Sequence, residues 1–265
     1  MCAADWAEAS VSRALFEALC EVDPARKCAM VSALQISDDV VGETADVELA
    51  RDPRIPGRPV RPELVNPRDV AFRGLGTAEG RAAMVHAVAH IEFNAVNLAL
   101  DATLRFPGLP AGYYADWISV AQDEARHFAM LSDRLAQLGY AYGDFSAHNG
   151  LWEAAEKTAH DPLVRMALVP RVLEARGLDV TPNMIRRLKE VGDPATAAIL
   201  GVILEEEVRH VAIGTHWYRY LCNSRGVDPV ARFRELLVEH RVRLQRPFNT
   251  EARARAGFDA AELAG

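Results

Sequence analysis

Hydrophobic residues recur every three or four positions over most of the chain, a spacing typical of helices with one buried face. Strict alternation of hydrophobic and polar residues, which indicates a half-buried strand, is nearly absent. The pattern predicts helices at about 5–21, 24–36, 78–105, 111–138, 151–176, 182–191, 194–223 and 229–245. The fold class expected from this pattern is all-α.

Proline and glycine mark the expected helix boundaries. An aspartate or threonine followed by proline has the form of a helix start, and such pairs stand at 23–24, 161–162, 181–182, 193–194 and 228–229. Gly139, Gly177, Gly192 and Gly226 stand where helices should end. Two internal prolines, at 162 and 170, predict a break or kink in the helix at 151–176.

The order of these segments predicts one structural domain with four parts. We expect N-terminal helices packed on a bundle (1–40), an extended Pro/Arg-rich arm (41–78), the bundle itself (79–225), and a C-terminal helix and tail (226–265). Six arginines and six acidic residues cancel in the arm, so a packed covering arm is favoured over a nucleic-acid contact. Segment 232–255 carries seven arginines and is a candidate partner surface, although a solvated helix face is favoured.

Composition narrows the function classes. The 265 residues include 30 basic and 37 acidic ones, and a net charge of −7 disfavours nucleic-acid binding over the whole chain. Four cysteines form no Cys-x-x-Cys pair, which disfavours a cysteine zinc site or an iron–sulfur cluster. The chain shows neither the features of a signal peptide nor an apolar run of the roughly 20 residues that cross a membrane. We therefore expect a cytoplasmic protein that does not bind membranes.

A repeated Glu-x-x-His motif carries the candidate chemistry. Glu124 with His127 forms the first copy, and Glu207 with His210 forms the second copy 83 residues later. Residues three apart on a helix point the same way, so each pair can reach one metal ion. A lone helical glutamate precedes each copy: Glu92 lies 32 residues before the first, and Glu174 lies 33 residues before the second.

These residues also occupy the hydrophobic seams of their helices. The seam that contains Glu124 and His127 also contains Trp117, Val120 and Leu131, and its successive positions are spaced 3, 4, 3 and 4 residues apart. The other predicted ligands keep the same rhythm on their own helices. A single Glu-x-x-His is more often a surface pair, but two seam-facing copies with matched upstream glutamates are hard to reach by chance. The predicted metal ligands are therefore Glu92, Glu124, His127, Glu174, Glu207 and His210.

Charge explains why such a set calls for metal. Each buried charge costs several kcal/mol, and like charges close together force some carboxyls to keep a proton. Four glutamates carry a charge of −4, which two divalent cations neutralise. Mixed carboxylate and imidazole ligands suit iron or manganese better than calcium or thiolate-bound zinc. We expect two divalent ions, with iron favoured and manganese or a mixed Fe/Mn pair as alternatives.

The order Glu, Glu-x-x-His, Glu, Glu-x-x-His resembles that of the ferritin-like di-metal carboxylate superfamily. The chain also resembles a ferritin-like family of unknown function, in stretches such as Thr77–Arg81, His90–Ala95 and Val169–Pro182. More distantly, it resembles the tRNA-modifying di-iron monooxygenases. The resemblance implies a ferritin-like four-helix bundle, here with extra N- and C-terminal helices and a long irregular arm.

Three functions follow as hypotheses. The first is a di-iron oxidoreductase that activates O₂ or peroxide toward an unknown small-molecule substrate. The second is a ferroxidase or peroxide-detoxifying protein without an organic substrate, which needs the same ligands. The third is a non-catalytic helical interaction protein. A homodimer is among the expected assemblies, and the sequence names no catalytic group beyond the metal ligands.

Overall fold

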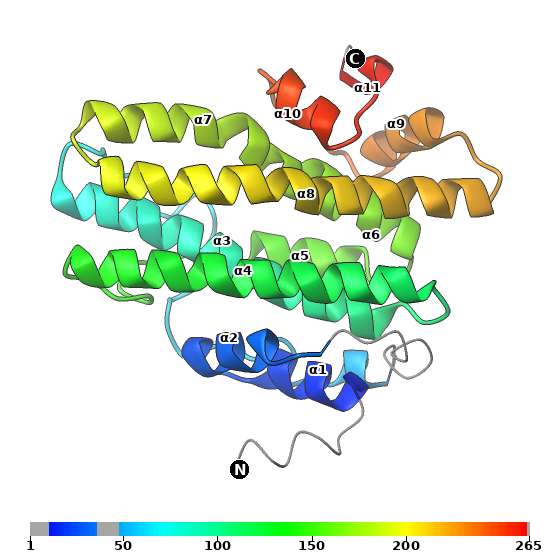
Figure 1. Cartoon of the computed structure of the whole chain (residues 1–265), viewed down its shortest axis with the longest axis horizontal. Helices are drawn as coiled ribbons and strands as arrows, with labels where there is room; N and C mark the ends of the chain where they lie inside the picture. Colours follow the sequence, from blue (N-terminus) through cyan, green and yellow to red (C-terminus); the bar gives the residue numbers. More distant parts are fainter. Residues whose placement is uncertain (1–10, 36–47, 264–265) are drawn as a thin grey trace. The chain divides into compact units, whose positions relative to one another are not determined.

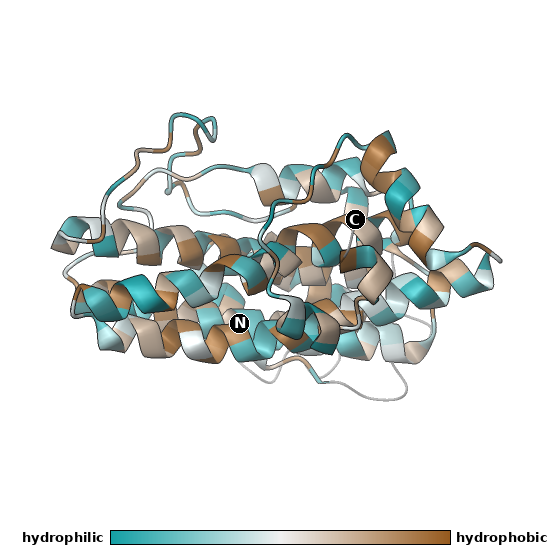
Figure 2. Ribbon diagram, turned by 90° about the horizontal axis from the view of Figure 1, so that it is seen from above, coloured by the Kyte–Doolittle hydropathy of each residue, from teal (hydrophilic) through white to brown (hydrophobic). Residues whose placement is uncertain are grey.

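The computed structural model describes residues 11–35 and 48–263, and its regular elements in these ranges are all helical (Figure 1). One isolated bridge joins Leu64 and Ala147. The chain divides into two compact units, Met1–Trp152 and Glu153–Gly265. The helices carry hydrophobic and hydrophilic bands along their length (Figure 2), as expected for elements with one buried face. The all-α prediction is confirmed.

The first unit is built on two long helices, α3 (Ala78–Arg105) and α4 (Ala111–Gln137), which pack along each other. The Thr77 side chain caps α3 by accepting a hydrogen bond from the Gly80 amide at 3.0 Å. Helix α1 (Val11–Cys20) packs on α3, and α2 (Pro24–Ser32) packs on α4. The two long helices thus present their apolar seams to each other.

Residues 48–77 of the arm are irregular except for a 3₁₀ turn, Leu49–Arg51; residues 36–47 lie outside the described ranges. Gly57 lies against α1, where its amide donates to the Leu19 carbonyl at 2.8 Å. A Cβ atom on Gly57 would stand 2.1 Å from the carbonyl oxygen of Cys20, so only glycine fits this approach. The arm is therefore packed closely against the end of α1 at this point.

The second unit contains the end of α5 (Gly150–Lys157), then α6 (Pro162–Leu168), the π-helix η4 (Val169–Glu174) and α7 (Ala175–Glu190). After a short turn, α8 (Pro194–Ser224) packs along α7. Helices α9 (Pro229–Glu239), α10 (Thr250–Arg255) and α11 (Ala260–Leu263) follow. A buried cluster joins α7, α8 and α10 through Ala175, Leu178, Val208, Val211, Ala252, Ala256 and Phe258.

Most predicted boundaries are found. The side chains of four aspartates before proline accept hydrogen bonds from amides of the first helical turn, at Asp23, Asp161, Asp193 and Asp228. Gly139, Gly192 and Gly226 have positive φ angles of 83°, 78° and 64°, as a helix end requires. The helices at 78–105, 111–138 and 194–223 match α3, α4 and α8 to within one residue.

The predicted helix at 151–176 and the separate helix at 182–191 are wrong. The chain breaks before Pro162 as expected, but it then runs as α6, η4 and α7 through Pro170, Gly177 and Pro182 to Glu190. Pro182 has no N–H to donate to the carbonyl of residue 178. That carbonyl, of Leu178, accepts a hydrogen bond from the Asn249 side chain at 3.1 Å instead. A residue distant in sequence thus lets the helix continue.

Two helix ends also differ from prediction. Helix α2 ends at Ser32 rather than 36, and α9 ends at Glu239 rather than 245, with Arg241 at a φ of 55°. The short helices α10 and α11 were not predicted, because six and four residues, respectively, are too few to show a helical period. The predicted start of the first helix, at residue 5, lies outside the described residues.

Candidate metal centre

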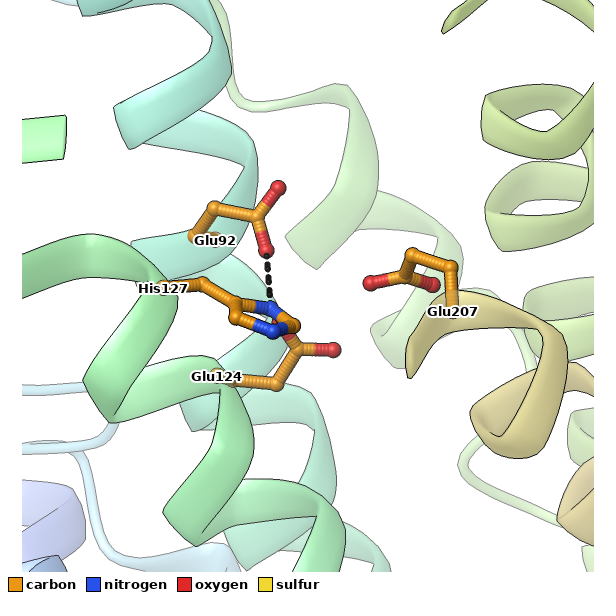
Figure 3. Close-up of side chains that lie close together, drawn as sticks. All are labelled: Glu92, Glu124, His127 and Glu207. Atoms are coloured by element: carbon orange, nitrogen blue, oxygen red, sulfur yellow. Dashed lines mark hydrogen bonds and ion pairs between the residues drawn. The ribbon is translucent and has the colours of Figure 1, made fainter. Parts of the chain in front are cut away.

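Three of the predicted ligands come together in the first unit. Glu92 projects from α3, and Glu124 and His127 project from one face of α4. Each is buried, with exposed fractions of 4%, 0% and 0%. Their ligand atoms lie within 4.8 Å of one another, and Figure 3 shows the three side chains pointing toward a common centre. The seam positions inferred from the sequence therefore become a compact carboxylate–imidazole triad.

The imidazole of His127 lies between the two carboxylates. Its Nδ1 is 3.3 Å from Oε2 of Glu92 and 3.3 Å from Oε2 of Glu124. Burial lowers the pKa of His127, but hydrogen bonds to Glu124 and Glu92 outweigh it and raise the pKa to about 11. A proton on His127 thus offsets one of the two carboxylate charges in the metal-free protein. A divalent cation would offset both, so metal binding should release this proton.

An aromatic cluster joins α3, α4 and the segment after α4. Phe93 of α3 and Phe128 of α4 have their rings 5.5 Å apart. The Tyr142 ring packs against both, at 5.6 Å from Phe93 and 5.0 Å from Phe128. These contacts fix α3 against α4, the two helices that carry the triad.

Polar contacts behind this aromatic cluster fix its geometry. Nδ1 of His90 is 2.8 Å from the Tyr142 hydroxyl, and its Nε2 is 3.1 Å from the His148 carbonyl. Nε2 of His86 accepts a hydrogen bond from the Gly143 amide at 2.9 Å. Burial lowers the pKa of His86 and of His90 to about 4. Both histidines are therefore neutral at pH 7 and engaged in packing contacts.

The second Glu-x-x-His copy lies in the second unit, on α8. His210 is fully buried, and its Nδ1 stands 3.4 Å from Oε1 of Glu207, whose side chain is 12% exposed. Asp193 caps this helix by accepting from the Thr196 amide at 3.0 Å. The i, i+3 spacing thus brings the glutamate and the imidazole side by side, as it does in the first unit.

Glu174, the remaining predicted ligand, is the last residue of the π-helix η4. π-Helices are rare and are found mostly at functional sites. The sequence prediction placed Glu174 in a helix but gave no sign of this geometry. Its role as a ligand, and that of His210, remain predictions.

The donor chemistry fits a divalent transition metal. Within the first unit, Glu92, Glu124 and His127 offer carboxylate oxygens and an imidazole nitrogen that could bind a metal ion. This mixture of oxygen and nitrogen donors, without thiolate, suits iron or manganese. The triad of the first unit already contains two carboxylates, so one divalent ion would neutralise it. The residues present therefore fit a divalent metal ion.

Comparison with known proteins identifies the family. The model of the family "Protein of unknown function (DUF455)" matches residues 20–264. The chain belongs to this DUF455 family. It is also 45% identical, over 260 residues, to an uncharacterized protein of Haemophilus influenzae, and the match covers 93% of this chain and 90% of that protein. No solved structure matches the chain significantly. The predicted membership in a family of unknown function is thus confirmed.

Among the described residues, this DUF455 chain has no helix that is long and apolar enough to span a membrane.

Several residues that shape the centre were not singled out from the sequence. Tyr142 and Asn94 hold His90, with Nδ2 of Asn94 at 3.1 Å from His90 Nε2.

Proposed function

We propose that this DUF455 chain is a di-metal carboxylate oxidoreductase. Two divalent ions, with iron favoured, would be held by Glu92, Glu124, His127, Glu174, Glu207 and His210 within a ferritin-like bundle. The observation that carries the proposal is the buried triad in the first unit, where two carboxylates and an imidazole lie within 4.8 Å. Burying these groups without a cation is unfavourable, and metal binding is the most direct reason to keep them.

The register of the second unit supports Glu174 and His210 as ligands. A Cβ atom on Gly214 of α8 would stand 2.3 Å from Cβ of Pro170, so α8 touches η4 closely there. His210 lies one turn before Gly214, and Glu174 lies about one turn after Pro170. The short turn after α7 makes α7 and α8 antiparallel neighbours. Glu174 and His210 are therefore expected on adjacent turns, facing each other.

Each unit then contributes an equivalent set of two glutamates and one histidine. The charge of each set, −2 with a neutral imidazole, matches one divalent ion. When bound, two iron ions would supply the electrons with which O₂ or peroxide is activated toward a small organic substrate. The chain's own part is to hold the ligands in register, to release the His127 proton as metal enters, and to keep the centre among apolar side chains.

Metal binding is the first test. The full chain, purified metal-free, is loaded with Fe²⁺ under anaerobic conditions, and bound iron is counted by elemental analysis. We expect two ions per chain, with stabilisation of about 3 kcal/mol for each bound ion at a free metal concentration of 100 Kd. Glu124→Ala should lose bound iron. Glu153→Ala, which removes an exposed glutamate of α5, is the matched control and should bind as the wild type does.

Reaction with oxygen is the second test. Iron-loaded protein is mixed with O₂ in a stopped-flow oxygen assay, with Glu124→Ala and free Fe²⁺ as references. Fast O₂ consumption limited to the two bound irons supports the oxidoreductase. Uptake of many irons per chain into a large assembly would instead identify a ferroxidase. A wild-type chain that binds no metal would refute the proposal and leave a helical interaction protein.

A further inference from the structure

The second unit buries an arginine next to the proposed ligand Glu174. Arg171 lies in the π-helix, three residues before Glu174, and is 0% exposed. Its guanidinium carbon lies 4.5 Å from the Tyr218 ring, 4.2 Å from the Phe233 ring and 4.6 Å from the Phe258 ring. Such contacts stabilise a cation in an apolar site but leave its hydrogen-bonding capacity largely unused.

One carboxylate pairs with this cation. Nη2 of Arg171 donates to Oε1 of Glu262, a buried residue of α11 that is 91 positions away in the sequence. Oε2 of Glu262 accepts from the Asp259 amide at 2.8 Å, which orients the carboxylate toward the π-helix. The C-terminal end of the described chain is thus joined to the π-helix by a buried ion pair.

A second buried ion pair holds the other side of Glu174. Arg253 of α10 donates to both oxygens of Asp179, at 2.9 and 2.7 Å, and to the Ala175 carbonyl at 3.4 Å. The Asn249 amide also donates to Asp179, at 2.9 Å. Contacts from segment 249–262 therefore reach positions 171, 175 and 179, before and after Glu174.

These contacts exceed what packing requires. A buried ion pair is often no more stabilising than apolar residues of the same volume, so two such pairs are poor evidence for stability alone. The two pairs do fix the orientation of the helices that carry them, because each guanidinium must meet its carboxylate in one geometry. Both pairs act on the short stretch where the chain passes from η4 to α7. The residue at that junction is Glu174.

We propose that segment 249–262 positions Glu174 for metal binding, with Arg171 and Glu262 as positioning residues that act through the π-helix. This inference rests on the proposed function, because it takes Glu174 to be a ligand. It predicts that the two metal ions respond differently when the segment is loosened. The ion held by Glu92, Glu124 and His127 keeps its affinity, and the ion held with Glu174 loses it.

The test is a titration of the full-length, metal-free protein with Mn²⁺ alone, with free Mn²⁺ measured by electron paramagnetic resonance. The wild type should bind two ions. Glu262→Gln should bind one ion with unchanged affinity and the other at least 10-fold more weakly. Glu205→Gln is the matched control: it removes an exposed ion pair between α8 and Arg255 of the same segment, without touching the π-helix. It should bind both ions normally.

A double variant distinguishes a positioning role of Glu262 from a general stabilisation of the fold. Glu174→Gln should lose the same ion, and adding Glu262→Gln to it should weaken Mn²⁺ binding no further, since both changes act on one ligand. Circular dichroism and thermal unfolding verify that each variant is folded. If Glu262→Gln does not fold, Asp179→Asn carries the test, because it weakens the second ion pair and should produce the same selective loss.

The outcomes distinguish this inference from the proposed function. Selective loss of one ion in Glu262→Gln or Asp179→Asn supports the positioning role. Two ions bound equally well by the wild type and by the folded variants overturn the positioning role and leave the metal centre standing. A wild type that binds no Mn²⁺ and no Fe²⁺ overturns both.

Discussion

Each unit of the chain carries one Glu-x-x-His helix, and each also contains a cation that is 0% exposed, but these two cations are held in different ways. Lys27 in the first unit and Arg171 in the second are both 0% exposed. Lys27 donates to three neutral oxygens and lies over the Phe93 ring, at 5.3 Å from its centroid, with no carboxylate among these partners. Arg171 is surrounded by three aromatic rings and one carboxylate. The difference follows from whether the side chain can give up its proton.

Lys27 joins three parts of the first unit. Its ammonium donates to the carbonyls of Leu19 at 3.0 Å and Gly57 at 3.1 Å, and to the side-chain oxygen of Asn97 on α3. Burial lowers the pKa of Lys27 to about 7. Since a neutral amine can still donate two hydrogen bonds, this site can lose its charge without losing all of its contacts.

Arg171 has no such freedom, because a guanidinium keeps its proton at any ordinary pH. Burial lowers the pKa of Arg171, with Glu262 acting in the opposite direction, but the side chain remains charged. The second unit therefore depends on Glu262 to neutralise Arg171. The comparison suggests that the first unit tolerates changes around its cation better than the second unit does.

The largest effect is expected at Glu262. Glu262→Ala leaves the Arg171 charge buried without its carboxylate, which should lower the free energy of unfolding by about 3–5 kcal/mol. Glu205→Ala breaks the pair with Arg255, in which the two side chains are 67% and 50% exposed, and should lower the free energy of unfolding far less, because solvent screens this pair. Urea unfolding measures both. Equal losses would show that burial of the pair does not matter, and would break the comparison.

Two glycines allow a matched test of the backbone contacts. Gly57→Ala and Gly214→Ala each place a Cβ atom into a close contact, 2.1 Å from the Cys20 carbonyl oxygen and 2.3 Å from Pro170 Cβ. Each should cost about 1–3 kcal/mol through overpacking.

The two alanine variants should differ in metal binding. Gly214→Ala displaces the π-helix and should weaken one Mn²⁺ ion in the titration. Gly57→Ala moves the arm and should leave both ions bound. Loss of the same ion in both variants would mean that general destabilisation, rather than the π-helix, controls metal binding.

A smaller effect is expected at Lys27. Lys27→Met removes the donor from the two carbonyls and Asn97 while keeping a chain of similar length, and should cost about 1–3 kcal/mol, near the lower end if water reaches the carbonyls. The free energy of unfolding at pH 8, compared with that of Glu262→Ala, measures the difference between the units. A loss for Lys27→Met larger than that for Glu262→Ala would reverse the comparison.

The sequence predicted what depends on local pattern. Asp-Pro starts and glycine ends set most helix boundaries, and seam spacing placed Glu92, Glu124 and His127 where they meet. The sequence did not predict features that depend on residues far apart in the chain. Asn249 supports the helix through Pro182, and Glu262 pairs with Arg171 across 91 positions. No periodicity marks such contacts, because each joins one isolated polar residue to another. The π-helix was missed for the same reason, since its sequence reads as ordinary helix.

Acid should act on the first unit through His86. Burial lowers its pKa to about 4, with Asp144 acting weakly in the opposite direction. An unfolded histidine titrates near 6.5, so the unfolded state binds more protons between pH 6.5 and 4. Stability is therefore lost as the pH falls through this window, by at most about 1.4 kcal/mol per pH unit for His86. Above pH 6.5 this dependence disappears.

His86→Gln tests this source of acid sensitivity. Glutamine keeps an acceptor for the Gly143 amide but does not titrate, so the free energy of unfolding should fall less steeply between pH 7 and 5 than in the wild type. His160→Gln, at an exposed position in the second unit, is the control for replacing a histidine by glutamine. Parallel curves for the wild type and His86→Gln would locate the acid sensitivity elsewhere. A shallower curve would identify neutral buried histidine, rather than the buried cations, as the pH-sensitive feature of the first unit.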